Sequence, residues 1–211
     1  MSKCKSYVLV PGKDEYEHQF GGAEWDMDAC GICKGDIHQI ATLDLEDPRL
    51  EMFRNPTAGR IPMISCLNCS ASWWRQGYII SNNRIEWDYQ DVEEAEVMTE
   101  EDYIVTPLPT VDMKLEEYDD SDVDKFWEEF GSKFLCKVGG DPIWAGEEVE
   151  LKCPDCGKEM EFVAMIGGEY PGKAKSVLPQ VSFGIGTNVY YYAICPECGE
   201  ITVDCQERTF Q

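Results

Sequence analysis

Cysteine is the residue type in this sequence with the clearest capacity for chemistry. Eight of the eleven cysteines form four Cys-x-x-Cys pairs. Two thiolates separated by two residues can bind one tetrahedral metal ion from a single tight turn, and a second such turn completes the shell. Four pairs therefore predict two Cys4 metal sites. The first would be formed by Cys30, Cys33, Cys66 and Cys69, and the second by Cys153, Cys156, Cys195 and Cys198.

We predict that both sites hold structural Zn²⁺. The second set is the more typical, because its two pairs read Cys-Pro-x-Cys-Gly and glycine permits a positive φ after the knuckle. Eight thiolates fill two tetrahedral shells and leave no position for a catalytic water. Disulfides are a competing explanation, although cytosolic thiols remain reduced; iron–sulfur clusters are the residual alternative. Cys4, Cys136 and Cys205 are predicted to be ordinary small residues.

Strands are the elements expected to position these cysteines. Six segments are apolar, β-branched or alternating and are bounded by turn residues. They are Tyr7–Val10, Ile37–Leu45, Trp73–Ile80, Met160–Ile166, Val189–Ile194 and Glu200–Cys205. Two short helices are also predicted, one starting at Thr99 and one over Asp120–Phe130. In Tyr190-Tyr191-Tyr192, alternate rings are expected to face the core and a partner.

An internal repeat links the two cysteine sets. A Gly-Gly pair with a tryptophan close behind precedes each set, at Gly21-Gly22 and at Gly139-Gly140, and the Cys-x-x-Cys pairs are offset by 123 and 129 residues. We therefore predict a β-rich α+β fold with two tandem related units, each carrying a Cys4 zinc-knuckle pair. The units are expected at residues 1–85 and 134–211, joined by an acidic connecting segment with short helices at residues 86–133.

Negative charge dominates the composition. The chain has 41 acidic and 18 basic residues, a net charge of −23. Residues 86–129 alone carry 18 acidic and 2 basic side chains, a net charge of −16. This field repels phosphate backbones, so direct nucleic-acid binding is not expected, and it attracts basic proteins.

The acidic segment has two interpretations. It is either a solvated linker or a docking surface for a basic partner, with aromatic anchors inside an acidic rim. The candidate partner-binding residues are Glu93, Glu94, Glu100, Glu101, Asp102, Glu116, Glu117, Asp119, Asp120 and Trp127. No run of about 18 apolar residues predicts a membrane helix, and the apolar stretch Tyr7–Val10 is too short for a signal peptide. The expected location is the cytoplasm.

The second unit resembles two known families. The run from Phe134 to Trp144, which contains Lys137-Val-Gly139-Gly140, is followed by Cys-Pro-Asp-Cys-Gly, a tyrosine-rich strand and Cys-Pro-Glu-Cys-Gly. This pattern resembles the bacterial YwqG-like family, a domain of unknown function, and the programmed-cell-death-protein-two family of ribosomal-protein chaperones. The match covers residues 134–205 and reaches residues 18–80 only through the repeat.

The resemblance implies a non-enzymatic binding protein. YwqG-like proteins often occur among bacterial immunity proteins, so the leading hypothesis is an immunity protein that binds a cognate toxin and masks its active site. The alternative is a chaperone or adaptor for a basic, ribosomal-type protein. A metal-dependent enzyme or redox protein is a third hypothesis, but the sequence has only two histidines, and His38 is expected on a strand face.

Overall fold

The computed structural model describes residues 5–53, 59–91, 96–99, 103–130, 133–168, 178, 183 and 185–208. These residues form one twelve-stranded sheet, one α-helix and two short 3-10 helices. The strands are β1 (Ser6–Pro11), β2 (Gln19–Gly22), β3 (Asp26–Met27), β4 (His38–Asp44), β5 (Arg60–Ser65), β6 (Gln76–Ser81), β7 (Arg84–Gln90), β8 (Leu108–Tyr118), β9 (Leu135–Gly139), β10 (Glu161–Gly167), β11 (Asn188–Ile194) and β12 (Glu200–Glu207). The helices are η1 (Pro48–Phe53), η2 (Ser70–Trp73) and α1 (Val123–Phe130).

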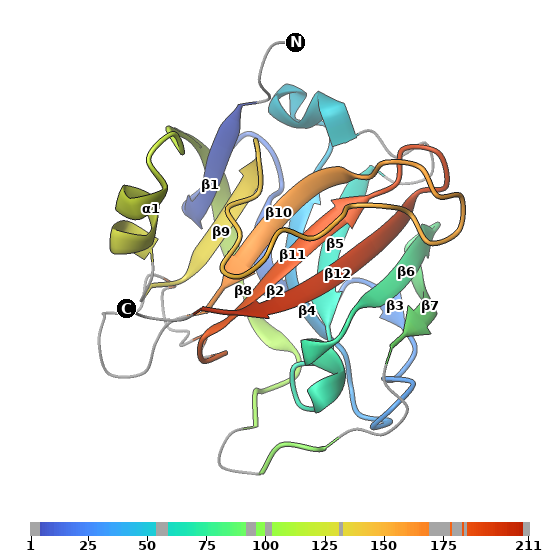
Figure 1. Cartoon of the computed structure of the whole chain (residues 1–211). Helices are drawn as coiled ribbons and strands as arrows, with labels where there is room; N and C mark the ends of the chain where they lie inside the picture. The colour runs from blue at the N-terminus through green and yellow to red at the C-terminus, as the bar shows by residue number, and fades with distance from the viewer. Residues whose placement is uncertain are drawn as a thin grey trace.

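The strand order across the sheet is β3-β7-β6-β12-β11-β10-β9-β1-β8-β2-β4-β5. All neighbours are antiparallel except β3 and β7. The sheet curls so that β5 lies over β6 and β11 (Figure 1). The hydroxyl of Tyr78 on β6 donates to the carbonyl of Pro62 at 2.6 Å, and that of Tyr192 on β11 donates to the carbonyl of Ile64 at 3.3 Å. The main core fills the space between these layers.

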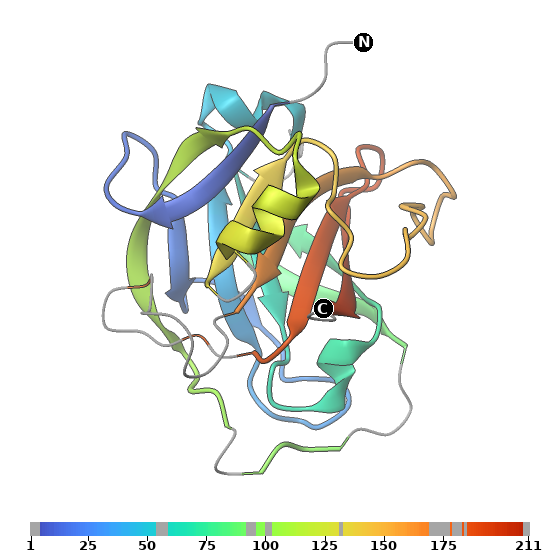
Figure 2. The ribbon, with the colours of Figure 1, turned by 60° about the vertical axis from the view of Figure 1, so that its left-hand side comes forward.

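A second, smaller core lies on the other face of β9, β10 and β11, under α1. Phe126 of α1 packs there with Leu135 and Phe162, and Figure 2 shows α1 lying across this side of the sheet. Because successive strand side chains point to opposite faces, Tyr190 belongs to the main core and Tyr191 to the core under α1. All three consecutive tyrosines of β11 are buried, so the expectation that alternate rings face a partner was wrong.

The six predicted strands correspond to β1, β4, β6, β10, β11 and β12, with ends that differ by up to three residues. The predicted helix over Asp120–Phe130 is confirmed as α1. Thr99 lies in no helix, and residues 100–102, where that predicted helix would continue, lie outside the described residues. Two strands in the acidic segment, β7 and β8, were not predicted. The β-rich character is confirmed.

Residues from both predicted units contribute to the same sheet. β1 pairs with β9, and β6 pairs with β12, so each pairing joins the first range to the second. The acidic segment contributes β8, whose eleven residues lie between β1 and β2 inside the sheet. No described helix is both long and apolar enough to span a bilayer.

Candidate metal centres

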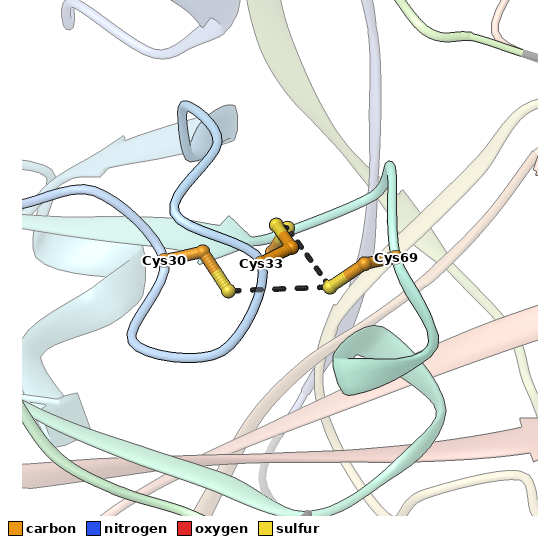
Figure 3. A group of neighbouring side chains, drawn as sticks. Cys30, Cys33 and Cys69 are labelled. Carbon is orange, nitrogen blue, oxygen red and sulfur yellow. Dashed lines mark hydrogen bonds between the residues drawn. The ribbon is translucent and has the colours of Figure 1, made fainter. Parts of the chain in front are cut away.

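Four cysteines from two loops meet at the first centre. Cys30 and Cys33 lie on the loop between β3 and β4, and Cys66 and Cys69 follow the end of β5. The sulfur atoms of Cys33 and Cys66 are 3.5 Å apart, and Cys69 Sγ lies 4.0 Å from Cys30 Sγ and 3.4 Å from Cys66 Sγ. Figure 3 shows the sulfur atoms of the two facing loops pointing toward one another.

The second centre has the same arrangement. Cys153 and Cys156 precede β10, and Cys195 and Cys198 follow β11. The sulfur atoms lie 4.0 Å apart for Cys153 and Cys198 and 3.6 Å apart for Cys156 and Cys195. Cys153 and Cys195 are buried, whereas Cys156 and Cys198 are exposed. The predicted pairing of the four knuckles is therefore confirmed at both centres.

These distances fit one tetrahedral ion per centre. Four sulfur atoms bonded to zinc at about 2.3 Å are separated by about 3.8 Å, near the middle of the observed range of 3.4 to 4.0 Å. Disulfide sulfur atoms would be separated by about 2.05 Å. Either cluster could hold a metal ion. With all four positions occupied by cysteine, such an ion would have no free site for substrate.

The protonation equilibria of the first centre favour a cation. Hydrogen bonds from the Cys66 and Cys69 thiols lower the pKa of Cys30, and the same contacts raise the pKa of Cys66 and raise that of Cys69 to about 12. Four mutually close sulfur atoms therefore cannot all ionise unaided. A divalent ion supplies the positive charge that allows four thiolates, so the donor set fits a thiophilic metal.

Three of the four knuckles share one backbone conformation. The residue after the second cysteine has a positive φ at Lys34 (63°), Gly157 (69°) and Gly199 (74°). Its amide donates to the first cysteine's carbonyl at 2.9–3.0 Å in each case. The knuckle at Cys66 departs from this pattern, because the chain continues from Cys69 directly into η2. The glycines of the second set are thus explained by the turn, as the sequence suggested.

Two polar side chains contact the cysteines from neighbouring strands. Gln90 at the end of β7 places its Nε2 3.7 Å from Cys30 Sγ and accepts a hydrogen bond from the Gly31 amide at 2.9 Å. Glu200 at the start of β12 is fully buried, with Oε2 3.2 Å from Cys153 Sγ. Burial raises the pKa of Glu200, which favours the neutral acid beside the Cys153 sulfur. Sequence reasoning missed both residues. Gln90 lies far along the chain from either knuckle of the first centre. Glu200 directly follows Cys198-Gly199, and this position was the signal that could have identified it.

Both histidines are held by hydrogen bonds in the core. His18 Nδ1 accepts from the Asp44 amide at 3.1 Å, and its Nε2 donates to Asp47 at 2.9 Å. His38, the first residue of β4, accepts from the Leu67 amide at 3.3 Å. Burial lowers the pKa of His38. These hydrogen bonds hold both imidazole rings in fixed positions inside the fold.

The candidate partner-binding residues are in several different settings. Glu93, Glu94, Glu100, Glu101 and Asp102 lie outside the described residues. Glu116, Glu117 and Asp119 are exposed at the end of β8 and beyond it, and Glu117 pairs with Lys5 at 2.8 Å. Trp127 is half-buried, with its ring 5.2 Å from Phe126 and 5.9 Å from the Arg208 guanidinium.

Asp120 is engaged inside the protein. Its carboxylate lies 3.0 Å from the ammonium of Lys137, whose side chain is fully buried, and it accepts a hydrogen bond from Ser6. Burial opposes ionisation, but these two hydrogen bonds and the Lys137 charge together lower the pKa of Asp120. This carboxylate has a structural role within the described fold.

Comparisons of the chain with protein-family models, with curated proteins and with solved structures find no match.

Proposed function

We propose that each Cys4 centre binds one structural Zn²⁺ ion. The support is the separation of the sulfur atoms, which suits a single ion. An iron–sulfur cluster places several irons and sulfides between its cysteines and would hold them farther apart. Metal analysis of the purified chain distinguishes zinc from a single iron ion in the same tetrahedral site.

We also propose that the two units arose by duplication, as the family resemblance implies. β2, β4 and β5 are consecutive neighbours in the sheet, and so are β9, β10 and β11. β4 and β10 each begin five residues after a knuckle, and each carries a β-bulge seven residues after it, at Ile40 and Val163. His38, the first residue of β4, pairs with Ser65, which directly precedes the knuckle at Cys66. In the same way Glu161, the first residue of β10, pairs with Ile194, which directly precedes the knuckle at Cys195.

The Gly-Gly pairs add a further correspondence. Gly21 and Gly139 both have a positive φ, of 69° and 68°. Two residues earlier, Gln19 Nε2 donates to the Gly21 carbonyl at 3.3 Å, and Lys137 Nζ donates to the Gly139 carbonyl at 2.7 Å. The bulge and the register recur at the same offsets from the knuckle, and the glycine turn recurs in the same order, nine residues before Cys30 and fourteen before Cys153. Such recurrence supports common descent better than convergence.

We propose that the chain functions as a non-enzymatic protein-binding protein whose partner is basic. One observation carries this proposal. Of the thirteen described acidic residues in the range 86–129, twelve are exposed, and Asp120 is the exception. Ion pairs within the described part of the chain engage Glu86, Glu116 and Glu117. The remaining exposed carboxylates are available to attract a positively charged protein.

The particular role that we propose is that of an immunity protein, which masks the active site of a cognate toxin. The YwqG-like resemblance supports this choice. Electrostatic capture suits it, because steering can raise association rates by about 10–10³-fold, and a toxin must be bound before it acts.

The test begins with affinity capture of the partner from the source cells and continues with purified components. We expect the association rate to fall at least about tenfold between low and physiological salt. A variant with Glu116→Gln, Glu117→Gln and Asp119→Asn should slow association and keep the fold, because all three side chains are exposed. Co-expression should abolish the partner's toxicity. A captured ribosomal protein without toxicity would replace the immunity role with that of a chaperone, and salt-independent association would refute electrostatic capture.

A further inference from the structure

Exposed apolar side chains gather at the first Cys4 centre. Among the described residues, six large apolar side chains are exposed, and five of them lie at the end of η2, in the residue that follows it, or in residues 97–105. We call these five the tryptophan–strap surface: Trp73, Trp74, Val97, Tyr103 and Val105, which are 48–61% exposed. The sixth, Val123, lies on α1. Solvated tryptophans grouped with other apolar residues are typical of an interaction site.

Backbone contacts hold this surface against the knuckle at Cys66. Val97 forms an isolated β-bridge with Cys69, and the Ser70 amide donates to the Glu96 carbonyl at 2.9 Å. Asn68, inside the knuckle, donates through Nδ2 to the Ile104 carbonyl at 2.8 Å and accepts from the Ile104 amide at 2.8 Å. The described residues on both sides of residues 100–102 are thus tied to one metal loop.

The buried side of the same segment is anchored as well. His38 Nε2 lies 2.8 Å from the Thr106 hydroxyl and 3.1 Å from the Ile104 carbonyl. Figures 1 and 2 both place η2 and the segment that precedes β8 at the same end of the molecule. These contacts position the backbone beside Tyr103 before any partner binds. Pre-organisation of this kind lowers the entropic cost of association.

The surroundings of this surface are acidic. The described acidic residues of the range 91–102, Asp91 and Glu96, are both exposed. The Asp91 amide donates to the carbonyl of Arg75, the residue after Trp74, at 3.1 Å. Asp36, next to the first knuckle, is also exposed. Lys34 and Arg75 are basic neighbours of the surface, and Arg75 pairs with Asp204 at 3.6 Å. A partner that covers the tryptophans must therefore be cationic as well as apolar. Arginine meets both requirements, because its guanidinium stacks on aromatic rings and pairs with carboxylates.

We propose that the tryptophan–strap surface docks an arginine-rich segment of the partner that also carries apolar side chains. This inference rests on the proposed function, since it assigns a surface and a chemistry to the basic partner. The apolar side chains would cover Val97 and Val105, and the arginines would stack on Trp73 and Trp74 and reach the carboxylates around them. Glu116, Glu117 and Asp119, at the other end of β8, would then contribute to the attraction of the partner over a longer distance.

The experiment uses the full chain and a synthetic peptide of alternating arginine and leucine as the probe. Binding is followed by tryptophan fluorescence and calorimetry. Trp73→Ala combined with Trp74→Ala should weaken binding at least tenfold. Val123→Ala, the matched exposed apolar change on α1, should alter it less than twofold. Unchanged metal content and melting temperature in each variant verify that the first centre is intact. Peptides of alternating glutamate and leucine, or of arginine and glycine, should bind at least tenfold more weakly than the probe.

Several results would overturn the proposal. One is equal binding of the probe by the tryptophan variant and the unaltered chain. Another is equal binding of the arginine–glycine peptide, which would show that the rings contribute nothing. A dimer that the tryptophan variant dissociates would assign the surface to a second copy of the chain.

The companion variant with Glu116→Gln, Glu117→Gln and Asp119→Asn separates this inference from the proposed function. If that variant weakens binding and the tryptophan variant does not, the docking surface is wrong while basic-partner binding stands. If the probe fails to bind the unaltered chain, and the captured partner associates without salt dependence, both are refuted.

Discussion

Replacing Asp120 by asparagine should destabilise the fold, although Asp120 lies in a segment whose carboxylates are otherwise exposed. The Lys137 side chain is completely buried in β9, and its ammonium lies 3.0 Å from the Asp120 carboxylate. Its other described acceptors are the carbonyls of Gly139 and Asp141, both at 2.7 Å. Asp120→Asn removes this counter-charge from a buried ammonium, while the two carbonyls and the Phe162 ring, whose centroid lies 5.3 Å from Nζ, stay in place.

The expected loss is about 2–3 kcal/mol of unfolding free energy. Breaking a buried ion pair by removing one partner typically costs about 3–5 kcal/mol. The Asp120 side chain is 23% exposed and two carbonyls still accept from Lys137, so we expect a value below that range. For a chain of this size the melting temperature should fall by roughly 4–12 °C. Asp119→Asn, one residue earlier and exposed, should change the free energy by less than about 0.5 kcal/mol.

Urea unfolding of the two variants, followed by circular dichroism, measures this difference. The pH dependence gives a second readout. Because the folded-state pKa of Asp120 is lowered, its contribution is present above the unfolded value near 3.9 and is lost as the pH falls through the folded value. The free energies of the unaltered chain and of Asp120→Asn should therefore converge in acid. Equal stability of Asp120→Asn and Asp119→Asn at neutral pH would refute the reasoning.

Three further perturbations test the metal centres, a glycine turn and a buried histidine. Metal analysis of the chain should find two zinc ions. Cys153→Ser should lose one ion and melt at a lower temperature, because structural zinc contributes on the order of 10 kcal/mol in small domains. Cys205→Ser should keep both ions, and fewer than two ions in the unaltered chain would contradict the two-centre assignment. Gly21→Ala should cost more than about 2 kcal/mol, because φ is +69° and the added Cβ would lie 2.3 Å from a carbonyl oxygen; Gly157→Ala, at the same φ in open space, should cost about 1 kcal/mol, and similar losses would show that the clash is relieved. Burial lowers the pKa of His38. The stabilising contribution of its neutral ring is therefore present above the unfolded pKa near 6.5 and is lost as the pH falls, by no more than about 1.4 kcal/mol per pH unit. Urea titrations between pH 7.5 and 5.5 should show that the unfolding free energy changes less steeply with pH in His38→Gln than in the unaltered chain, and identical slopes would contradict a buried neutral imidazole.

The cysteine pairing could be predicted because it depends on local spacing. Each knuckle brings two sulfur atoms together within four residues, and the order of the pairs along the chain leaves one simple way to join them. The strands that flank the knuckles were predictable for a related reason, since buried segments such as Val189–Ile194 are almost wholly apolar.

β8 was missed because composition concealed its pattern. Val111, Met113 and Leu115 alternate with polar residues, as a strand with one buried face requires, and Met113 and Leu115 are buried. Charged residues (Asp112, Lys114 and Glu116) occupy the other face. The excess of negative charge over residues 86–129 favoured interpretation of this region as a connecting segment. Alternation within the charged region was the signal that could have identified the strand.

The Asp120–Lys137 pair had no comparable signal. Lys137 lies seventeen residues further along the chain, in a strand whose five residues are all buried. Only the pairing of β1 with both β8 and β9 brings the two side chains together. Contacts of this kind depend on tertiary topology, and the sequence holds no periodicity from which they can be read.

The first Cys4 centre differs from the second at the two positions that hold the acidic segment. Where the last knuckle has Glu197 and Gly199, the knuckle at Cys66 has Asn68 and Ser70. The Asn68 side-chain amide donates to the Ile104 carbonyl and accepts from the Ile104 amide. The Ser70 hydroxyl accepts from the Glu96 amide at 3.0 Å. Ser70 lacks the positive φ found after the other three knuckles, at Lys34, Gly157 and Gly199, and the chain turns instead into η2, which carries Trp73. One departure from the repeated pattern therefore accounts for both halves of the tryptophan–strap surface. We therefore propose that the second centre only stabilises the fold, whereas the first stabilises the fold and also presents a binding surface on its outer side.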